Sequence, residues 1–545
     1  MSKPFAITLD PGSSLANKTG SWRTERPVYV DRLPPCNHAC PAGEDIQGWL
    51  FYAESGNYKA AWESLVVNNP FPAIMGRVCY HNCETACNRG QLDAAVNIHA
   101  VERFLGDEAI KQGWQFNPTR EPTGKRVLIV GAGPSGLTAA YHLARRGHTV
   151  VIHEAGPMPG GMMRFGIPKY RLPRNILDAE VARIIAMGNG KSVEIKLNTR
   201  IDNLAATMND GHFDAVFLAT GAHIAKRAYI PAGDASRILD AVGLLRDVET
   251  GQAPQLGRRV IVYGGGNTAL DAARTAKRLG AQEAIIVYRR TREKMPAHDF
   301  EVREALEEGI QIKWLSTITQ ADNQKFVVEK MVLDRTGFPQ PTGEFETMEA
   351  DSLVLALGQD VDLSFLEHVE GLAFEQGVLK VDGQMMTGHK GIFAGGDMVP
   401  SERTVTVAAG HGKKAARYID AYLNGEVYVP PAKHELAVFE RLNTWYYSDA
   451  PKTVQPMLDS IRRQTSFDEV QGGLDRDTAL FEARRCLSCG NCFECDNCYG
   501  VCPDNAVKKL GPGNRFEFNY DYCKGCGLCV AECPCGAIEM VPETI

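Results

Sequence analysis

Cysteine is the residue type whose spacing in this chain points most directly to chemistry. The chain has 545 residues and 16 cysteines, which gather towards its two ends. In a long chain, thiols grouped this tightly are more typical of metal ligands than of disulfides. Two runs near the C-terminus each read C-x2-C-x2-C-x3-C-P, and their members are Cys492, Cys495, Cys498, Cys502, Cys523, Cys526, Cys529 and Cys533. We therefore expect a metal-binding tail.

The repeated run has the spacing of bacterial two-cluster ferredoxins, in which the fourth cysteine of each run serves the other cluster. Three thiolates on one tight loop hold a face of a [4Fe-4S] cubane, and the fourth crosses to the partner. One cluster would take Cys492, Cys495, Cys498 and Cys533, and the other Cys523, Cys526, Cys529 and Cys502. A pair of zinc knuckles is the alternative, but zinc sites seldom show this duplicated triplet.

Five more cysteines lie in the first 90 residues, spaced as C-x3-C-P and C-x3-C-x3-C: Cys36, Cys40, Cys79, Cys83 and Cys87. Segments 45–69 and 95–110 carry apolar residues at helical spacing, which predicts a helical domain with metal holding its ends. Zinc is again the alternative, and His38 or His81 could then serve as a ligand. The cysteine-rich tail favours iron and sulfide.

The elements between the two cysteine groups begin with a glycine fingerprint, G-x-G-x-x-G, whose glycines are Gly131, Gly133 and Gly136. An apolar run at 127–130 precedes it, and a helix-like segment and the β-branched strand 149–152 follow. In such a unit the glycines permit a tight turn and the approach of a pyrophosphate, and the helix N-terminus faces the anion. Glu154 closes the second strand, where an acid would bind the ribose hydroxyls.

Two further stretches suit the same nucleotide-binding unit. The loop 156–173 carries Gly160 and Gly161 between prolines, so it is non-helical and able to lie close to a flat cofactor. The apolar strand in 213–222 runs into a small-residue turn at Gly221. A strand of this kind commonly closes a nucleotide-binding sheet.

A second fingerprint, RRVIVYGGGNTALD, spans residues 258–271. Gly264 and Gly266 fit, and Ala269 takes the third position, which the motif permits. The strand after its helix ends in Arg289 and Arg290 instead of an acid. Arginine accepts a 2′-phosphate at this position, so the unit favours NADPH over NADH. A solvated arginine run is the alternative, because charge runs at strand ends are frequent.

Two strand-then-glycine elements follow, and we expect both to return to the first sheet. The first, SLVLALGQ, ends with Ala356 and Gly358, and the second, KGIFAGGD, ends at Asp397 before a helix that begins near Thr404. Asp397 is placed to hydrogen-bond a ribityl or phosphate hydroxyl beside that helix N-terminus. A plain helix-capping aspartate is the alternative.

Composition narrows the class of protein. The length predicts three or four domains, and a net charge of −7 gives no sign of a nucleic-acid partner. No apolar run reaches a membrane span and residues 1–20 do not read as a leader, so we expect a cytoplasmic protein. Residues 1–30 look like a flexible arm.

Together these motifs resemble the small (β) subunit of NADPH-dependent glutamate synthase and its relatives, which include the N-terminal half of dihydropyrimidine dehydrogenase and the flavin subunit of the electron-bifurcating NADH-dependent ferredoxin:NADP oxidoreductase. The matching stretches, from about Cys36 to Tyr422, are CPAGEDIQGWL, GRVC, CETAC, GAGPSG, GGMMRFGIPKYRLP, GGGNTALD, YRRTREKMPA and FAGGD. The resemblance implies an α/β fold with two Rossmann-like domains of the disulfide-reductase type, one for FAD and one for NADPH. A helical iron–sulfur domain would precede them and a bacterial ferredoxin-like α+β domain would follow.

The ranges expected on this basis are 1–120 for the helical domain, 121–240 and 351–430 for the FAD domain, 241–350 for the inserted NAD(P)H domain, 431–485 for a linker and 486–545 for the ferredoxin domain. The matching stretches imply that Arg171 contacts flavin, and that Arg289 and Arg290 contact the NADP phosphate. No side-chain acid or base is required, because the cofactors carry the chemistry. The predicted cofactor-binding residues are Gly131, Gly133, Pro134, Ser135, Gly136, Glu154, Gly161, Arg171, Gly221, Gly264, Gly266, Asn267, Thr268, Arg289, Arg290, Ala356, Gly358, Gly396, Asp397, Thr404 and Val405.

One departure from the relatives concerns the metal ligands. Relatives begin with R-C-x2-C ahead of the Cys-Pro motif, but here that pair is absent before Cys36 and EARRCLSC at 482–489 looks like the missing piece displaced to the C-terminus. We therefore expect one cluster on Cys36, Cys87, Cys486 and Cys489. A second would use Cys40, Cys79 and Cys83 with Glu102, at or near the family's Gln or Glu position. This makes about four [4Fe-4S] clusters and leaves Cys535 free. The alternatives are that Cys486 and Cys489 are idle or alternative ligands, and that Glu102 is a plain helix-surface acid.

The leading hypothesis is an oxidoreductase subunit in which NADPH gives hydride to FAD, and single electrons pass through the clusters to a larger catalytic redox subunit or to ferredoxin. Reversed flow, which would reduce NADP+, is also open because cluster potentials vary widely. The alternatives are a glutamate synthase small subunit and a self-contained small-molecule reductase, although no residues remain for a substrate barrel. A non-catalytic redox scaffold is least favoured, since both nucleotide fingerprints are intact. We expect a hetero-oligomer.

Overall fold

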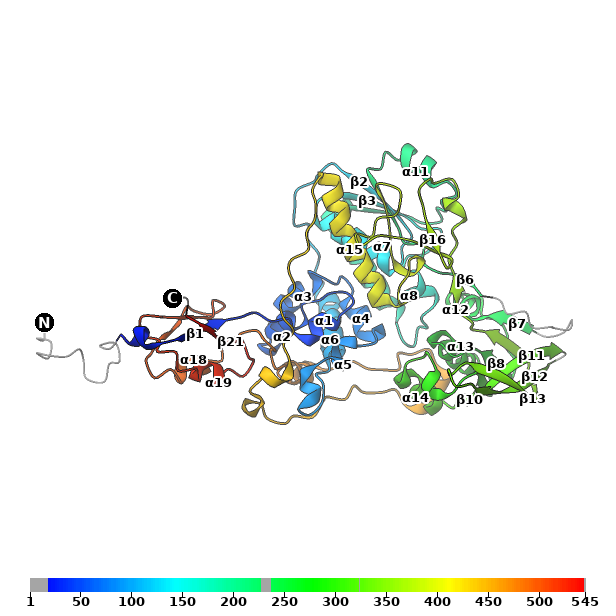
Figure 1. Cartoon of the computed structure of the whole chain (residues 1–545). Coiled ribbons are helices and arrows are strands. Elements are labelled where there is room, and N and C mark those ends of the chain that lie inside the picture. Colours follow the sequence, from blue (N-terminus) through cyan, green and yellow to red (C-terminus); the bar gives the residue numbers. More distant parts are fainter. Residues whose placement is uncertain (1–17, 227–236, 323, 544–545) are drawn as a thin grey trace, which may run out of the picture.

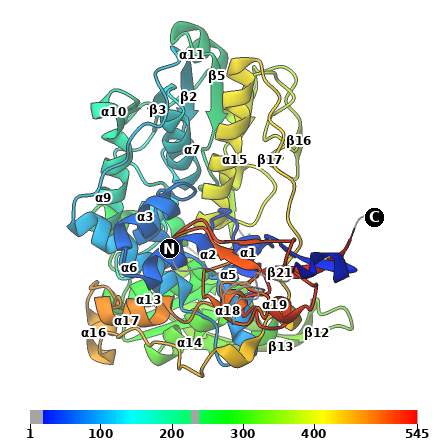
Figure 2. The same cartoon turned by 90° about the vertical axis from the view of Figure 1, so that its left-hand side faces the viewer.

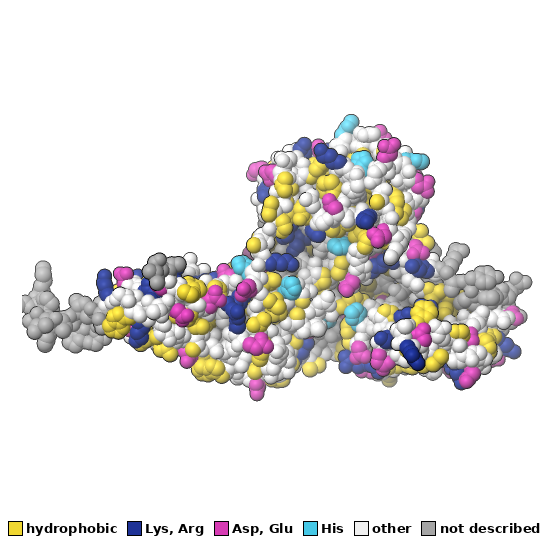
Figure 3. Space-filling view, viewed as in Figure 1, with side chains coloured by type: hydrophobic (Ala, Val, Ile, Leu, Met, Phe, Trp, Pro, Cys, Tyr) yellow, Lys and Arg dark blue, Asp and Glu magenta, His cyan; other side chains and the backbone are white. Residues whose placement is uncertain are grey.

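A computed structural model describes residues 18–226, 237–322 and 324–543. Figure 1 shows the helical N-terminal domain in the middle, with one nucleotide-binding domain above it, the other beside it and the cysteine-rich tail on the opposite side. In the turned view of Figure 2 the tail lies in front of the helical domain. Basic and acidic side chains are interspersed over the face seen in Figure 3. Among the described residues, no helix combines the length and the apolar character needed to cross a membrane.

The N-terminal domain is helical, as the spacing predicts. Asp45 and Asn57 cap the second and third helices by accepting hydrogen bonds from backbone N–H groups three residues on. The predicted apolar faces are buried, and Trp49, Trp62 and Leu65 lie in the core. The helices are α1 (Pro35–Ala39), α2 (Ile46–Glu54), α3 (Tyr58–Val66), α4 (Pro72–Val78), α5 (Asn82–Thr85) and α6 (Ile98–Lys111).

The first nucleotide-binding domain is built on a five-stranded parallel sheet of order β18-β5-β2-β3-β4. Its strands are β2 (Arg126–Val130), β3 (Thr149–His153), β4 (Val193–Lys196), β5 (Ala215–Leu218) and β18 (Ile392–Ala394), and its main helices are α7 (Pro134–Arg145), α9 (Arg174–Ile185) and α15 (Val405–Asn424). The predicted strand–turn–helix–strand unit is confirmed, and so is the return of the strand in KGIFAGGD to this sheet.

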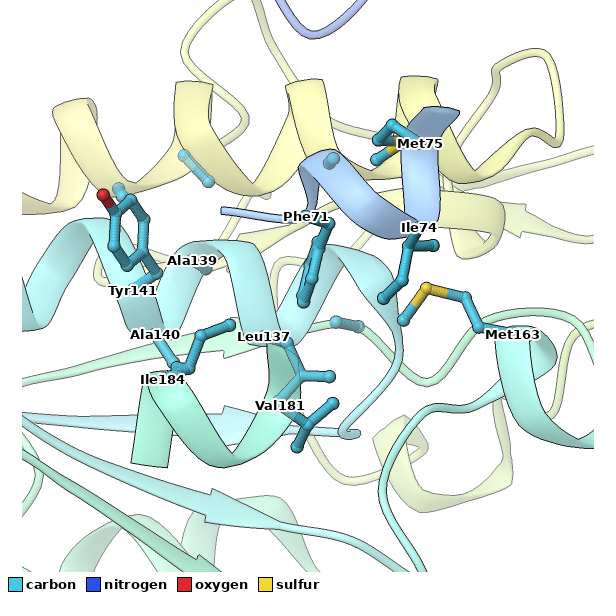
Figure 4. Packing of buried hydrophobic residues seen from close by; sticks show 14 of the residues in the cluster. Phe71, Ile74, Met75, Leu137, Ala139, Ala140, Tyr141, Met163, Val181 and Ile184 are labelled. Carbon is cyan, nitrogen blue, oxygen red and sulfur yellow. The ribbon is translucent and has the colours of Figure 1, made fainter. Parts of the chain in front are cut away.

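The core of this domain continues into the helical domain. Figure 4 shows Phe71 and Ile74, at the start of α4, beside Leu137 of α7 and Val181 of α9. Glu180, also on α9, accepts hydrogen bonds from the backbone N–H groups of the first turn of α4. The helical domain is therefore fixed against the first nucleotide-binding domain, with its cysteines held at a set place.

The second nucleotide-binding domain has a parallel sheet of order β10-β9-β8-β14-β7. The strands are β7 (Arg237–Asp240), β8 (Arg259–Tyr263), β9 (Glu283–Val287), β10 (Gln311–Lys313) and β14 (Ser352–Leu355), and the helices are α12 (Ala241–Glu249), α13 (Asn267–Arg278) and α14 (Asp299–Glu307). An antiparallel meander of β11 (Ser316–Asp322), β12 (Lys325–Leu333) and β13 (Pro339–Glu349) leads from β10 to β14.

The expectation that SLVLALGQ returns to the first sheet was wrong. β14 pairs with β8 and β7 and completes the second sheet. The meander acts as the crossover that a helix usually supplies, so the chain re-enters the sheet it has just left. Only after β14 does the chain return to the first domain.

The tail also recruits the N-terminal arm. Strand β1 (Glu25–Tyr29) pairs antiparallel with β21 (Ile538–Pro542), so residues 25–29 are not the flexible arm that we expected. Pairing satisfies the open edge that β21 would otherwise present. Residues 1–17 lie outside the described part. The other tail elements are α18 (Asn497–Gly500), α19 (Leu528–Ala531), β19 (Val507–Lys509) and β20 (Phe516–Phe518).

The stretch expected as a linker, 431–485, lies along the helical domain and the second nucleotide-binding domain. It contains α16 (Ser460–Thr465), which contacts α13, and α17 (Arg476–Ala483), which contacts α2 and α6. Arg463 is buried beside Glu308 of the second domain, and Ala479 is buried in the main core. This stretch brings Cys486 to the helical domain at the other end of the chain.

Short elements complete the fold. They are η2 (Thr19–Trp22), η3 (Asn88–Gln91), η4 (Arg292–Lys294), η5 (Ser364–Leu366), η6 (Gly396–Met398), η7 (Phe439–Arg441), η8 (Thr444–Tyr446), α8 (Met162–Phe165), α10 (Met187–Gly190), α11 (Leu204–Asp210), β6 (Ile224–Ala225), β15 (Gln359–Asp360), β16 (Phe374–Glu375) and β17 (Val378–Leu379).

Candidate cofactor and metal sites

A cavity of about 840 Å³ opens where the two nucleotide-binding domains meet the helical domain. Most of the predicted cofactor-binding residues line it: Gly131, Gly133, Pro134, Ser135, Glu154, Gly161, Arg171, Gly221, Gly266, Asn267, Thr268, Gly396, Asp397, Thr404 and Val405. Six predicted residues are not in its lining: Gly136, Gly264, Arg289, Arg290, Ala356 and Gly358. The structure therefore gathers residues from both glycine fingerprints around one space.

The floor of the cavity is shaped for a pyrophosphate. Gly161 has a φ of +51°, and a Cβ on it would lie 2.8 Å from the Cα of Gly133, so two glycine loops approach where no side chain fits. Ser135 stands in the first turn of α7, and its Oγ is buried with no hydrogen-bond partner among the described residues. A buried hydroxyl without a partner at a helix N-terminus fits an anionic ligand such as the FAD pyrophosphate.

Glu154 lies at the end of β3 as predicted. Its two carboxylate oxygens accept hydrogen bonds from the backbone N–H groups of Ala132 (2.8 Å) and Gly156 (2.7 Å). These bonds hold the carboxylate beside the glycine turn and facing the cavity. Each oxygen keeps a further acceptor position for a ribose hydroxyl.

Asp397 does not cap the helix that follows it. Thr404 caps α15, because its hydroxyl accepts from the backbone N–H of Val407 at 3.1 Å. Asp397 instead lies in the turn η6 and lines the cavity, where burial raises its pKa to about 6. The capping alternative is therefore excluded, and Asp397 stays free to meet a cofactor hydroxyl.

The glycine turn of the second fingerprint follows β8 and lies at the carboxyl ends of β8, β9 and β14. Because β8 and β9 are parallel and in register, Arg289 and Arg290 lie beside the Gly264 turn. Arg289 is exposed, and Arg290 is half-buried with its Nε unpartnered among the described residues. A Cβ on Gly264 would lie 2.2 Å from the carbonyl oxygen of Ala356, so Ala356 supports this turn and not the first one, which corrects its predicted place.

Arg171 joins the two domains at the edge of the cavity. Its guanidinium pairs with Asp271 of α13 at 2.8 Å and with Glu301 of α14. Asp271 and Glu301 are 5% and 2% exposed, so both acids are buried. The flavin contact implied by the resemblance remains a prediction, and the structure adds this interdomain ion group.

Tyr80 is a cavity residue that the motifs did not reveal. It lines the cavity directly after Cys79 in the chain, and its hydroxyl accepts a hydrogen bond from Asn267 Nδ2 at 2.5 Å. Its ring also stacks on His298 of the second domain, with ring centroids 3.6 Å apart. Its position next to a predicted metal ligand was the only signal in the sequence.

The structure brings the two ends of the chain together at one group of thiols. Cys36, Cys87, Cys486 and Cys489 line one small cavity. Burial raises the pKa of the Cys36 thiol, and the neighbouring Cys87, Cys486 and Cys489 thiols raise it further. All four cysteines are half-buried and all four thiols have raised pKa values, so they resist ionisation without a cation and form a donor set that fits an iron–sulfur cluster. We call this set the cross-chain group, because its members come from the two ends of the same chain.

A second group lies nearby in the helical domain, and its members are Cys40, Cys79, Cys83 and Glu102. Burial raises the pKa of Cys83, and Cys79, Cys40 and Glu102 add to the rise because their charges lie close to it. Glu102 is 6% exposed, which excludes the surface-acid alternative. Asn69 Nδ2 donates to Glu102 Oε1 at 2.9 Å and to Glu44 Oε1 at 2.9 Å. Glu44 is thus a second buried acid beside this group.

The tail gathers its eight cysteines as the ferredoxin spacing predicts. Cys502, Cys523, Cys526 and Cys529 line one small cavity, which we call the outer tail group. Burial raises the pKa values of the Cys492, Cys495 and Cys498 thiols, and the nearby Cys533 thiol adds to each rise. These four cysteines therefore lie together, and we call them the inner tail group. Cys535 is buried with its Sγ 3.8 Å from that of Cys533.

Iron content follows from these four groups. If each holds a [4Fe-4S] cluster, the anaerobically purified chain should contain about sixteen irons. Iron and acid-labile sulfide analysis, normalised to protein by amino-acid analysis, measures this directly. A value near eight would mean that only the tail groups are loaded.

Comparison with known proteins agrees with this arrangement. The pyridine nucleotide-disulphide oxidoreductase family matches residues 125–412, the 4Fe-4S cluster domain II of dihydropyrimidine dehydrogenase matches 24–114, and a 4Fe-4S dicluster domain matches 491–537. The chain is 36% identical to the β subunit of the NADP(+)-dependent formate dehydrogenase of Moorella thermoacetica, over 84% of this chain and 70% of that one.

Two other relatives are similar over most of their length. The β subunit of the NADPH-Fe(3+) oxidoreductase of Geobacter sulfurreducens is 34% identical, over 85% of this chain and 76% of that one. The small chain of the NADPH glutamate synthase of Escherichia coli is 32% identical, over 70% of this chain and 87% of that one. The chain therefore belongs to the pyridine nucleotide-disulphide oxidoreductase family, in a form that carries a 4Fe-4S domain on each side of its FAD- and NAD(P)-binding domains.

Proposed function

We propose that this chain is an electron-transfer subunit that moves electrons between NADP(H) and a larger redox partner through FAD and four [4Fe-4S] clusters. FAD, when bound, takes up two electrons as hydride and releases them one at a time, which joins nicotinamide chemistry to one-electron carriers. The residues of the chain bind and orient these groups. The relatives named as β subunits or a small chain support a hetero-oligomer with a catalytic partner.

The observation that carries the proposal is the continuous order of the cysteine groups. Tyr80 lines the cavity and directly follows Cys79 of the second group in the chain. Cys36 lies in the first turn of α1 and Cys40 directly follows its last residue, so one short helix joins the cross-chain group to the second group. The Gly490 N–H then donates to the Cys535 carbonyl at 2.7 Å, which ties the cross-chain loop to the inner tail group. The two tail groups adjoin by exchanging their fourth cysteines.

A tyrosine lies close to two of these groups. Tyr447 donates to the Leu487 carbonyl at 2.9 Å, and burial raises its pKa, with further contributions from Cys535, Cys486 and Cys489. It therefore lies near cysteines of both the cross-chain group and the inner tail group. Such a series suits electron flow in either direction, since cluster potentials span about −700 to +450 mV.

The direct test is anaerobic reduction by NADPH in a stopped-flow spectrometer, with freeze-quenched samples examined by EPR. We expect flavin absorbance to bleach first and reduced-cluster signals to follow in the same chain. A chain that reduces dyes at the flavin while its clusters stay oxidised would contradict the proposed function. Co-purification from the native host would then identify the partner.

Nucleotide preference gives a second test. Arg289→Ala with Arg290→Ala should raise the KM for NADPH by about tenfold to a hundredfold and leave that for NADH nearly unchanged, because a charge-assisted contact to the 2′-phosphate is worth about 1.5–3 kcal/mol. The control is Arg258→Ala, an exposed arginine at the opposite end of β8. A wild-type enzyme that prefers NADH would overturn the assignment.

A further inference from the structure

The N-terminal strand places a tyrosine hydroxyl on a predicted cluster ligand in the tail. Tyr29, the last residue of β1, lies with its hydroxyl oxygen 3.2 Å from Cys498 Sγ. Its ring stacks on Phe518 of β20, with centroids 4.7 Å apart and planes inclined by 16°. The β1–β21 pairing sets Tyr29 opposite Ile538. Backbone pairing and ring stacking thus fix the position of the hydroxyl independently of the sulfur.

The chemistry of a ligand sulfur decides the direction of this hydrogen bond. A cysteine that holds iron is a thiolate, which has no proton to donate, so the tyrosine hydroxyl must be the donor. A donor on a ligand sulfur offsets part of the negative charge of the cluster. Because the reduced cluster carries one more negative charge, it is stabilised more than the oxidised cluster, and the reduction potential rises.

The internal repeat of the tail shows that this contact is asymmetric. Cys529 stands in the second run where Cys498 stands in the first, and within the described part of the chain no tyrosine hydroxyl contacts Cys529. The backbone donor to the fourth cysteine of each group is matched: Ala506 N–H lies 3.2 Å from Cys502 Sγ of the outer group, and Ala537 N–H lies 3.4 Å from Cys533 Sγ of the inner group. Tyr29 thus adds a donor to the inner group alone.

We propose that Tyr29 raises the reduction potential of the inner tail cluster above that of the outer tail cluster, so that the N-terminal arm tunes the electron-transfer tail. This rests on the proposed function, since it requires both tail groups to hold clusters. The inner group is the one tied to the cross-chain loop through Gly490 and Cys535. An electron that enters the tail from the flavin side therefore resides mainly on the inner cluster until it is transferred to a partner.

The test is a redox titration followed by EPR on the full chain purified anaerobically. Tyr29→Phe removes the hydroxyl and keeps the ring on Phe518. The reduction equilibrium constant of one tail cluster should fall about tenfold, which is about 59 mV for a one-electron couple, while the other tail cluster and the iron content stay unchanged. The control is Tyr520→Phe, whose hydroxyl donates to the Pro27 carbonyl at 2.9 Å and not to a sulfur, and it should shift neither potential.

The possible outcomes separate this inference from the proposed function. Unchanged potentials in a Tyr29→Phe chain with full iron would overturn the inference alone. An equal shift in Tyr520→Phe would also overturn it, because a general change at the β1–β21 contact would then be the cause. A wild-type chain without two EPR-active tail clusters would overturn the proposed function and this inference together.

Discussion

Replacing Cys486 and Cys489 together by alanine is expected to remove about four irons per chain, which is one cluster, and to leave FAD and both tail clusters in place. The pair lines one small cavity with Cys36 and Cys87, so the double variant leaves only two thiols there. NADPH-dependent dye reduction at the flavin should continue. Reduction of the tail clusters by NADPH should slow severalfold, because the series of carriers is interrupted.

The structure also indicates that this variant will keep its fold. Arg485, next to Cys486, is 2% exposed and pairs with Glu482, and it donates to the Ala94 and Ala95 carbonyls. These contacts hold the end of α17 on the helical domain whether or not a cluster is bound. Limited proteolysis should therefore give the same fragments as the wild type, which separates loss of metal from loss of structure.

The matched control for the double variant is Cys535→Ala. Cys535 is a buried cysteine of the same chain that belongs to none of the four predicted ligand groups. Its replacement should leave the iron content unchanged. If the double variant retains all its iron, or if EPR shows that it has lost a tail cluster, the grouping of Cys486 and Cys489 with Cys36 and Cys87 is wrong.

The sequence predicted best those features that depend on short-range spacing. The glycine turns, the helices of the N-terminal domain and the gathering of the tail cysteines follow from local patterns, and the structure has all of them. The strand at 352–355 was assigned to the wrong sheet because its apolar run and glycine ending are the same for either sheet. Its partner is decided by the meander at 316–349, which no local pattern of the strand reveals.

Contacts between distant segments were the least predictable. Strand β1 contains Pro27, and its other residues are exposed or half-buried, so it lacks the alternation that identifies a strand. It pairs because the tail presents an open edge more than 500 residues later in the chain, as the register of Val28 with Glu539 shows. Tyr80 was missed for a related reason, since its partners Asn267 and His298 belong to another domain.

Arg171→Ala is expected to destabilise the protein by about 3–5 kcal/mol, because it leaves two buried carboxylates without their cation. Asp271 and Glu301 are 5% and 2% exposed and belong to the second nucleotide-binding domain, whereas Arg171 comes from the first. The same change should slow flavin reduction by NADPH about a hundredfold, since an error of about 1 Å in placing the nicotinamide is enough for that loss. Reduction of the bound flavin by dithionite, which needs no nucleotide domain, should be unchanged.

A neutral triple variant separates the fixing of the domains from a direct flavin contact. Arg171→Met with Asp271→Asn and Glu301→Gln leaves no unpaired buried charge, so its melting temperature should return most of the way to the wild-type value. Its flavin reduction by NADPH should stay slow, because no ion group then holds the two domains in register. If Arg171→Ala instead loses FAD on gel filtration and keeps its melting temperature, the contact to flavin implied by the resemblance is the main role of Arg171, and the interdomain ion group is secondary.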